Sequence, residues 1–190
     1  MKIFKQSEIE KISKCLKEGN IVSVPTETVY GLAVSLDNMK AISKLVNFKE
    51  KGNTPFTVML ADKNEIKKYG IVNDIAERII DKYVPGELTI IYKKNPQFKN
   101  DYFNDYDTIG IIIPNNEFMI ELLRKTGPIL IPSANKKGEK PCLTHEEVVE
   151  RLDIQYVVEG RCISNNPSTI ISVASSEIVY LRKGNLEIDI

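Results

Sequence analysis

The sequence predicts a single α/β domain built on a mixed β-sheet. Strand-like apolar runs alternate with amphipathic helical segments over the first two-thirds of the 190 residues, and the last third is mostly strand. No internal repeat and no long linker divides the chain, so we expect one domain over residues 1–190. The apolar runs 21–24, 109–113 and 129–131 are continuous, which is typical of strands covered on both faces.

The helices are predicted from capping residues at their starts and from apolar residues at helical spacing. In chain order, the helices start at Ser7, Asp37, Asp62, after residue 113 and at Thr144. Each predicted strand is a short apolar run next to turn-forming residues. In chain order, the strands cover 21–24, 56–61, 88–92, 108–113, 129–131, 156–158, 169–173 and 178–181, and residues 94–107 form a polar excursion.

The composition excludes several classes of function. The 26 basic and 26 acidic side chains balance, which argues against a strongly basic nucleic-acid coat protein. No apolar run approaches the roughly 18 residues of a membrane span. Charge within the first five residues argues against a signal sequence, so we expect a cytoplasmic protein.

The scarce residues narrow the chemistry further. The single histidine, His145, follows Thr144 in a capping box and is interpreted as an ordinary residue of a first helical turn. The three cysteines are far apart in the sequence and are expected to fill the core. No paired Cys and His residues have the spacing of a zinc site, so we expect no metal ligands from the protein.

Polar residues gather in three loops beside apolar strands, at 25–32, 132–138 and 165–169. Ligands of open α/β sheets bind where strands end, so hydroxyls and amides there suit a small polar ligand. Ordinary turn formation explains the same residue types equally well. Lys49 and Lys51 beside Gly52, together with Arg182, could hold phosphates or simply face solvent. The glycine patterns of P-loop and Rossmann sites are missing from the sequence.

These segments together resemble the YrdC-like L-threonylcarbamoyladenylate synthases. The most specific match is the run Pro25-Thr-Glu-Thr-Val-Tyr-Gly-Leu32. Further matching segments follow in the order typical of the family: Lys49 with Lys51, Pro85-Gly-x-Leu-Thr89, Ser133-Ala-Asn135, Ser168-Thr169 and Leu181-Arg-x-Gly184. The resemblance extends from about residue 8 to 186, and the length fits the short single-domain members.

The resemblance implies a twisted sheet with flanking helices around a deep basic cavity. It also implies that L-threonine and bicarbonate or CO2 form a carbamate, which attacks the α-phosphate of ATP to give threonylcarbamoyl-AMP and pyrophosphate. Mg²⁺ would accompany ATP. Partner transferase proteins would then pass the threonylcarbamoyl group to an adenosine beside the tRNA anticodon. Such phosphoryl chemistry depends mainly on positioning and charge stabilisation.

The resemblance also assigns roles to individual residues. The threonine-binding residues would be Thr26, Tyr30, Ser133 and Ser168. The ATP-binding residues would be Lys49, Lys51, Thr108, Asn135, Thr144 (through its backbone) and Arg182. Lys49, Lys51 and Arg182 would also be the catalytic residues, because they face the phosphates.

The sequence departs from the family pattern at two positions. Lys51 stands where the family usually has arginine, which keeps the charge but loses the bidentate geometry. Ile112 replaces a second arginine, and Arg161 is a candidate substitute for it. One lost charge-assisted hydrogen bond is worth about 1.5–3 kcal/mol. The loss therefore leaves an alternative open. The protein could share the fold and bind RNA or a nucleotide, with its synthase activity lost or altered.

Overall fold

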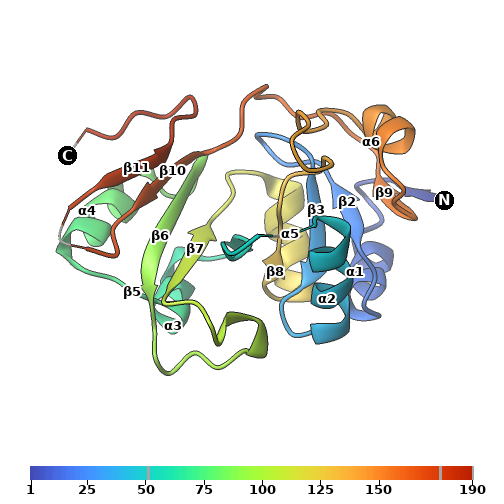
Figure 1. Cartoon of the computed structure of the whole chain (residues 1–190). Helices are drawn as coiled ribbons and strands as arrows, with labels where there is room; N and C mark the ends of the chain where they lie inside the picture. The colour runs from blue at the N-terminus through green and yellow to red at the C-terminus, as the bar shows by residue number, and fades with distance from the viewer. Residues whose placement is uncertain (51, 176, 190) are drawn as a thin grey trace.

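A computed structural model describes residues 1–50, 52–175 and 177–189 (Figure 1). These residues form six α-helices, two 3-10 helices and eleven strands. In chain order they are β1 (Lys2–Phe4), α1 (Ile9–Lys17), β2 (Val22–Val24), β3 (Gly31–Ser35), α2 (Met39–Phe48), β4 (Val58–Met59), η1 (Lys63–Glu65), α3 (Ile66–Tyr69), β5 (Gly70–Ile71), α4 (Asp74–Tyr83), β6 (Leu88–Lys94), η2 (Asp101–Phe103), β7 (Thr108–Ile112), α5 (Glu117–Thr126), β8 (Ile129–Leu130), α6 (His145–Arg151), β9 (Tyr156–Val158), β10 (Thr169–Ser172) and β11 (Val179–Arg182).

The strands form one mixed sheet in the order β1-β9-β2-β3-β8-β4-β7-β6-β10-β11, and β5 pairs with β6. The pairs β1/β9, β2/β9, β4/β7 and β6/β10 are parallel, and the other described pairs are antiparallel. Strands β10 and β11 lie at one end of the molecule and β1 with β9 at the other (Figure 1). The predicted α/β class with a mixed sheet is confirmed.

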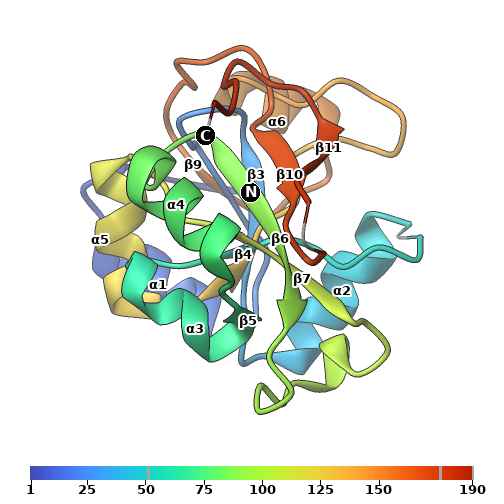
Figure 2. The same cartoon turned by 90° about the vertical axis from the view of Figure 1, so that its left-hand side faces the viewer.

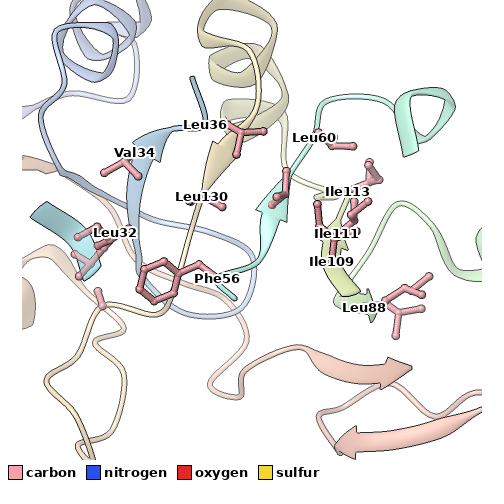
Figure 3. Close-up of a cluster of buried hydrophobic side chains, with 14 of the residues drawn as sticks. Leu32, Val34, Leu36, Phe56, Leu60, Leu88, Ile109, Ile111, Ile113 and Leu130 are labelled. Carbon is pink, nitrogen blue, oxygen red and sulfur yellow. The ribbon is translucent and has the colours of Figure 1, made fainter. Parts of the chain in front are cut away.

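Two clusters of buried apolar side chains form the core. The first contains the apolar faces of α2 and α4, and part of it is drawn in Figure 3. The second contains the faces of α1 and α5, which lie together on the side of the sheet opposite α2 (Figure 2). Strand β3 contributes to both clusters, because Leu32 and Val34 point into the first and Ala33 into the second.

The structure contains three strands that the sequence analysis did not predict, β1, β3 and β5. Residues 25–32 were expected to be loop throughout, but Gly31 starts β3, which pairs with both β2 and β8. The helix predicted from Asp62 to Tyr83 is also wrong as one element. Gly70 interrupts it by pairing with Lys94 of β6, and Asn73 then caps a new helix by accepting a hydrogen bond from Ala76 N.

Two predicted helix caps are wrong by one residue. Glu8 rather than Ser7 precedes α1, and its carboxylate accepts a hydrogen bond from Lys5 N instead of capping the helix. Asn38 rather than Asp37 caps α2, because its side chain accepts from Ala41 N. The cap at Thr144 is confirmed, since its Oγ1 accepts from Glu147 N.

The predictions for His145 and for the three cysteines are confirmed. His145 is the first residue of α6. The three cysteines are buried, at positions 15, 142 and 162. Within the described part of the chain, no helix is long and apolar enough to cross a membrane.

Candidate active site

A cavity of about 240 Å3 brings the three polar loops together. Its described lining comprises Thr26, Thr28, Val29, Tyr30, Gly31, Pro55, Phe56, Thr57, Met59, Thr89, Ile112, Ile131, Pro132, Ser133, Pro167, Ser168, Ile170 and Arg182. Five residues predicted from the sequence are therefore gathered in one place, and they are Thr26, Tyr30, Ser133, Ser168 and Arg182. This convergence favours a binding site for a small polar ligand over turn formation as the role of these loops.

One row of side chains across four neighbouring strands forms the floor of the cavity. Met59 of β4 is paired with Ile112 of β7, and Thr89 of β6 with Ile170 of β10. The antiparallel ladder between β6 and β7 places Ile112 opposite Thr89, one position beyond the pair Ile90 and Ile111. Residues in one row of a sheet share a face, so Ile112 lies near the middle of the floor.

The 25–32 loop is folded by its own hydroxyls. Thr26 is 8% exposed, and its Oγ1 donates to Val29 O at 2.7 Å and accepts from Thr28 N at 3.1 Å. Tyr30 is fully buried, and its hydroxyl donates to Val158 O at 2.9 Å. Turn formation and cavity lining therefore coexist here, and the Tyr30 hydroxyl already has a protein acceptor.

Lys49 is not in the described lining, but the 132–138 loop holds it next to the lining residue Ser133. Its Nζ donates to Ser133 O at 2.9 Å, to Asn135 O at 2.8 Å and to Asn135 Oδ1 at 2.9 Å. Ser133 Oγ donates to the same Oδ1 at 2.7 Å. Burial lowers the pKa of the Lys49 ammonium. All three ammonium donors are used, so Lys49 supplies fixed positive charge beside Ser133.

Arg182 closes the opposite side of the cavity through Ser168. Its Nε donates to Ser168 O at 2.9 Å and its Nη2 to Ser168 Oγ at 3.2 Å. Ser168 Oγ also lies 2.9 Å from Thr89 Oγ1 on the floor. Burial lowers the pKa of the guanidinium, but an arginine stays charged in proteins. Arg182 is thus a preorganised cation that faces the cavity.

Two residues assigned to ATP, Thr108 and Thr144, lie away from the cavity, whereas Lys49 and Asn135 contact its lining residue Ser133. Thr108 starts β7, opposite Lys93, and is four residues (about 13 Å of strand) from Ile112. Thr144 caps α6 and pairs with Arg161 in an isolated bridge. Neither is in the described lining of the cavity. Lys51 lies outside the described residues. All of these ATP roles stay predictions.

Among the described residues, Arg161 does not take the place of the arginine that the family resemblance implies at position 112. Arg161 is exposed and is not in the described lining. Arg182 is the one lining cation among the described residues, and Lys49 stands just behind Ser133. Nor do three or more described His, Cys, Asp or Glu residues gather in a group that could hold a metal ion.

The sequence analysis missed three residues of the lining that matter here, Thr28, Thr89 and Phe56. Thr28 and Thr89 lie inside the motifs quoted above, so their hydroxyls could have been predicted to line the site. Phe56 is an ordinary apolar residue next to a proline, and only the folded chain shows that its ring meets the cavity.

Glu27 turns away from the cavity although both neighbours line it. It faces a second hollow, lined also by Lys82, Glu87 and Asn115 among others. Neither carboxylate oxygen has a hydrogen-bond partner with good geometry among the described residues. Burial raises the pKa of Glu27 to about 7, the Asn115 amide opposes this shift, and Glu87 adds to it.

Comparison with known proteins shows the family of this chain. A family model for the Sua5/YciO/YrdC domain, described as "Telomere recombination", matches residues 14–184. The chain belongs to this family. Within the family, it is 38% identical over 184 residues to a putative threonylcarbamoyl-AMP synthase of Methanocaldococcus jannaschii, covering 95% of this chain and 87% of the relative.

Two other members of the Sua5/YciO/YrdC family are longer than this chain. The threonylcarbamoyl-AMP synthase of Bacillus subtilis is 30% identical over 186 residues, which cover 94% of this chain and 54% of that protein. The P. abyssi Sua5 structure, a complex with L-threonine, has a TM-score of 0.90 at 24% identity and covers 98% of this chain and 58% of that one. The chain thus spans little more than half of these two proteins, and the P. abyssi structure shows the shared fold.

Proposed function

We propose that this protein is an L-threonylcarbamoyladenylate synthase. It joins L-threonine, bicarbonate or CO2, and ATP into threonylcarbamoyl-AMP and pyrophosphate, with release of water where bicarbonate is used, and so is a nucleotidyltransferase. Relatives named as threonylcarbamoyl-AMP synthases support the reaction class. The observation that carries the proposal is the cavity that combines Thr26, Ser133, Ser168 and Arg182, with Lys49 bonded to Ser133 behind the lining.

In this proposal, the hydroxyl-rich side of the cavity binds threonine. Thr26, Ser133 and Ser168 offer oxygens that can exchange their internal hydrogen bonds for bonds to the amino acid. The apolar floor around Ile112 accepts its methyl group. The cavity of about 240 Å3 suits a small amino acid with its carbamate, whereas a whole nucleotide must extend beyond it.

The chemical step is an in-line displacement at phosphorus. A carbamate oxygen forms a bond to the α-phosphorus of ATP, the bond from that phosphorus to the bridging oxygen breaks, and pyrophosphate leaves with the electron pair. Arg182 and Lys49 stabilise the negative charge that develops on the phosphate oxygens. Positioning of the two reactants supplies the rest of the acceleration, because no residue has to form a covalent bond.

Mg²⁺ enters as the counter-ion of ATP in this proposal. Phosphate oxygens and water are its natural ligands, and no acidic cluster is needed from the protein. The product would pass to a tRNA and to the transferase proteins that modify the adenosine beside the anticodon. Both partners are part of the proposal and would meet the protein in the cytoplasm.

Pyrophosphate release tests the proposed reaction. The purified protein with Mg²⁺ is expected to release pyrophosphate only when ATP, L-threonine and bicarbonate are all present. Turnover of ATP that is independent of threonine, or no turnover at all, would contradict the synthase proposal.

Variants test the assigned residues. Thr26→Ala should mainly raise KM for threonine, and Arg182→Ala should mainly raise KM for ATP, each about tenfold or more. Lys49→Met should lower kcat/KM about a hundredfold, because it removes a fixed charge and leaves the Ser133 and Asn135 oxygens without their donor. Lys40→Met, on the exposed face of helix α2, which ends just before Lys49, is the matched control and should behave as wild type.

A second candidate function rests on Ile112. An apolar residue in the middle of the floor, where the family resemblance implies an arginine, favours a nucleotide- or RNA-binding protein that has lost the synthase step. In that case, wild-type protein binds tRNA in a salt-sensitive gel shift but makes no threonylcarbamoyl-AMP. Synthase turnover without salt-sensitive tRNA binding would exclude this candidate.

A further inference from the structure

Phe56 forms an aromatic wall of the candidate active site at the end of the 49–57 loop. Its side chain is 8% exposed and lines the cavity between Pro55 and Thr57. It also belongs to the core cluster that contains Leu32 and Leu130 (Figure 3). Residues 55–57 precede β4 and are not part of a strand, so sheet pairing does not fix the position of this wall.

Hydrogen bonds to other segments help to hold this end of the loop. Thr57 O accepts from Ile131 N at 3.0 Å, which ties the segment to the residue after β8. Phe56 N donates to the hydroxyl of Tyr102 at 2.9 Å. The rings of Phe56 and Tyr102 are also stacked, with centroids 5.9 Å apart and an interplanar angle of 19°. Tyr102 thus contacts both the backbone and the ring of the wall residue.

Tyr102 can hold this wall because its own segment is firmly anchored. It lies in η2, within the excursion between β6 and β7, where Asn100 Oδ1 accepts from Tyr102 N at 3.0 Å. Asn100 Nδ2 donates to Leu36 O at 3.0 Å and so ties the excursion to the residue after β3. The Tyr102 ring packs edge-on against Phe103, which is 1% exposed, with centroids 4.9 Å apart.

We propose that Tyr102 is a positioning residue of the candidate active site, which fixes the Phe56 wall and thereby sets the width of the threonine end of the cavity. This inference rests on the proposed function for the identity of the ligand. The excursion at 94–107 would then be part of the site's support, although Tyr102 is not in the cavity lining.

Tyr102→Phe is the decisive variant, since it keeps the stacked ring and removes only the hydroxyl that accepts from Phe56 N. Tyr69→Phe is the matched control, because it also removes one tyrosine hydroxyl from the same group of rings, which Tyr69 joins through Phe98 at 5.0 Å. Both variants are compared with wild type in two measurements, hydrogen exchange at the Phe56 amide and steady-state kinetics with threonine and ATP.

We expect Tyr102→Phe to speed exchange at the Phe56 amide by about tenfold and to raise KM for threonine about three- to tenfold, with kcat within about twofold. The control should change neither quantity. A purely structural role would instead lower the active fraction at unchanged KM, and that result would overturn the proposal. So would wild-type exchange and KM in Tyr102→Phe.

Failure of the proposed function gives a different result. If wild-type protein has no threonine-dependent turnover, the synthase proposal fails and the role of Tyr102 toward threonine fails with it. If wild type turns over and Tyr102→Phe is indistinguishable from it, only the present inference fails.

Discussion

At the scale of single residues, Glu27 has the most unusual environment in the 25–32 loop. Its carboxylate is buried without a good hydrogen-bond partner, which raises its pKa from 4.5 to about 7. The folded protein therefore holds this proton at pH values where the unfolded chain has lost it. The favourable contribution to folding is complete below about pH 4.5 and is lost as the pH rises to 7.

Glu27→Gln should therefore flatten the dependence of stability on pH. Glutamine keeps the shape but cannot ionise, so the free energy of unfolding should fall less between pH 5 and pH 8 than in wild type, by about 2 kcal/mol after allowance for partial exposure. Urea denaturation at several pH values measures this difference. Glu121→Gln, on the exposed side of α5, is the control, and a wild-type slope in Glu27→Gln would contradict the environment described for Glu27.

The residue scale also shows how far sequence reasoning reaches into the site. Thr26, Ser133, Ser168 and Arg182 meet in one cavity as their shared motif membership implied. Phe56 carries no signal of its own, because an apolar side chain looks the same in a core and in a cavity wall. Which neighbours a residue meets depends on strand register, and register is a property of the whole sheet.

At the scale of elements, the end of β11 and the start of β10 are in unusually close contact. A Cβ on Gly184 would lie 2.5 Å from Pro167 O and 2.6 Å from Thr169 N. Gly184 N also donates to Thr169 Oγ1 at 3.0 Å. Only glycine permits this approach, and the approach brings Arg182 to Ser168.

Gly184→Ala adds only one methyl group, but it should both destabilise the fold and weaken ligand binding. Backbone atoms cannot rotate away from the added methyl, so the two strands must separate, at a cost of about 1–3 kcal/mol in stability. Binding of ATP should weaken about tenfold if Arg182 loses its position. Thermal unfolding and calorimetric titration measure the two effects, with Gly52→Ala as the stability control, because a Cβ there meets nothing within 4 Å. Unchanged stability in Gly184→Ala would contradict the close packing.

Elements were predictable where their own sequence determines them. Long apolar strands such as β6 and β7, and the Thr144 cap of α6, follow from local patterns. Strands β3 and β5 do not, since Gly31 and Gly70 read as turn residues and become strand only through pairing with distant partners. The tertiary pairing overrides the local preference there.

At the scale of the whole molecule, the sheet joins the two core clusters into one structure. Because β3 contributes alternate residues to both, neither cluster can come apart while the other stays intact. The sequence predicts the α/β class and the single domain from the alternation of elements. It does not contain the strand order, in which β8 and β4 lie between β3 and β7.

Substitutions in the two core clusters should therefore destabilise the whole protein in the same way, in one cooperative unfolding transition. Leu45→Ala in the first cluster and Leu122→Ala in the second should each lower the free energy of unfolding by about 2–5 kcal/mol in one shared transition. Tyrosine fluorescence and far-UV circular dichroism in urea should give coincident curves for both variants. Two separated transitions would show that the clusters unfold independently.

Arg182 sits at the end of the most exposed strand of the molecule. All four residues of β11 are exposed, and its described pairing is with β10 alone. Strands of this kind open locally at a small fraction of the free energy that global unfolding requires. Fraying of this sheet edge would therefore remove Arg182, the one lining cation among the described residues, from the cavity. The free energy that opens the site is then smaller than the free energy that unfolds the protein. We therefore expect a mild denaturant that leaves the core intact to withdraw Arg182 from the cavity reversibly.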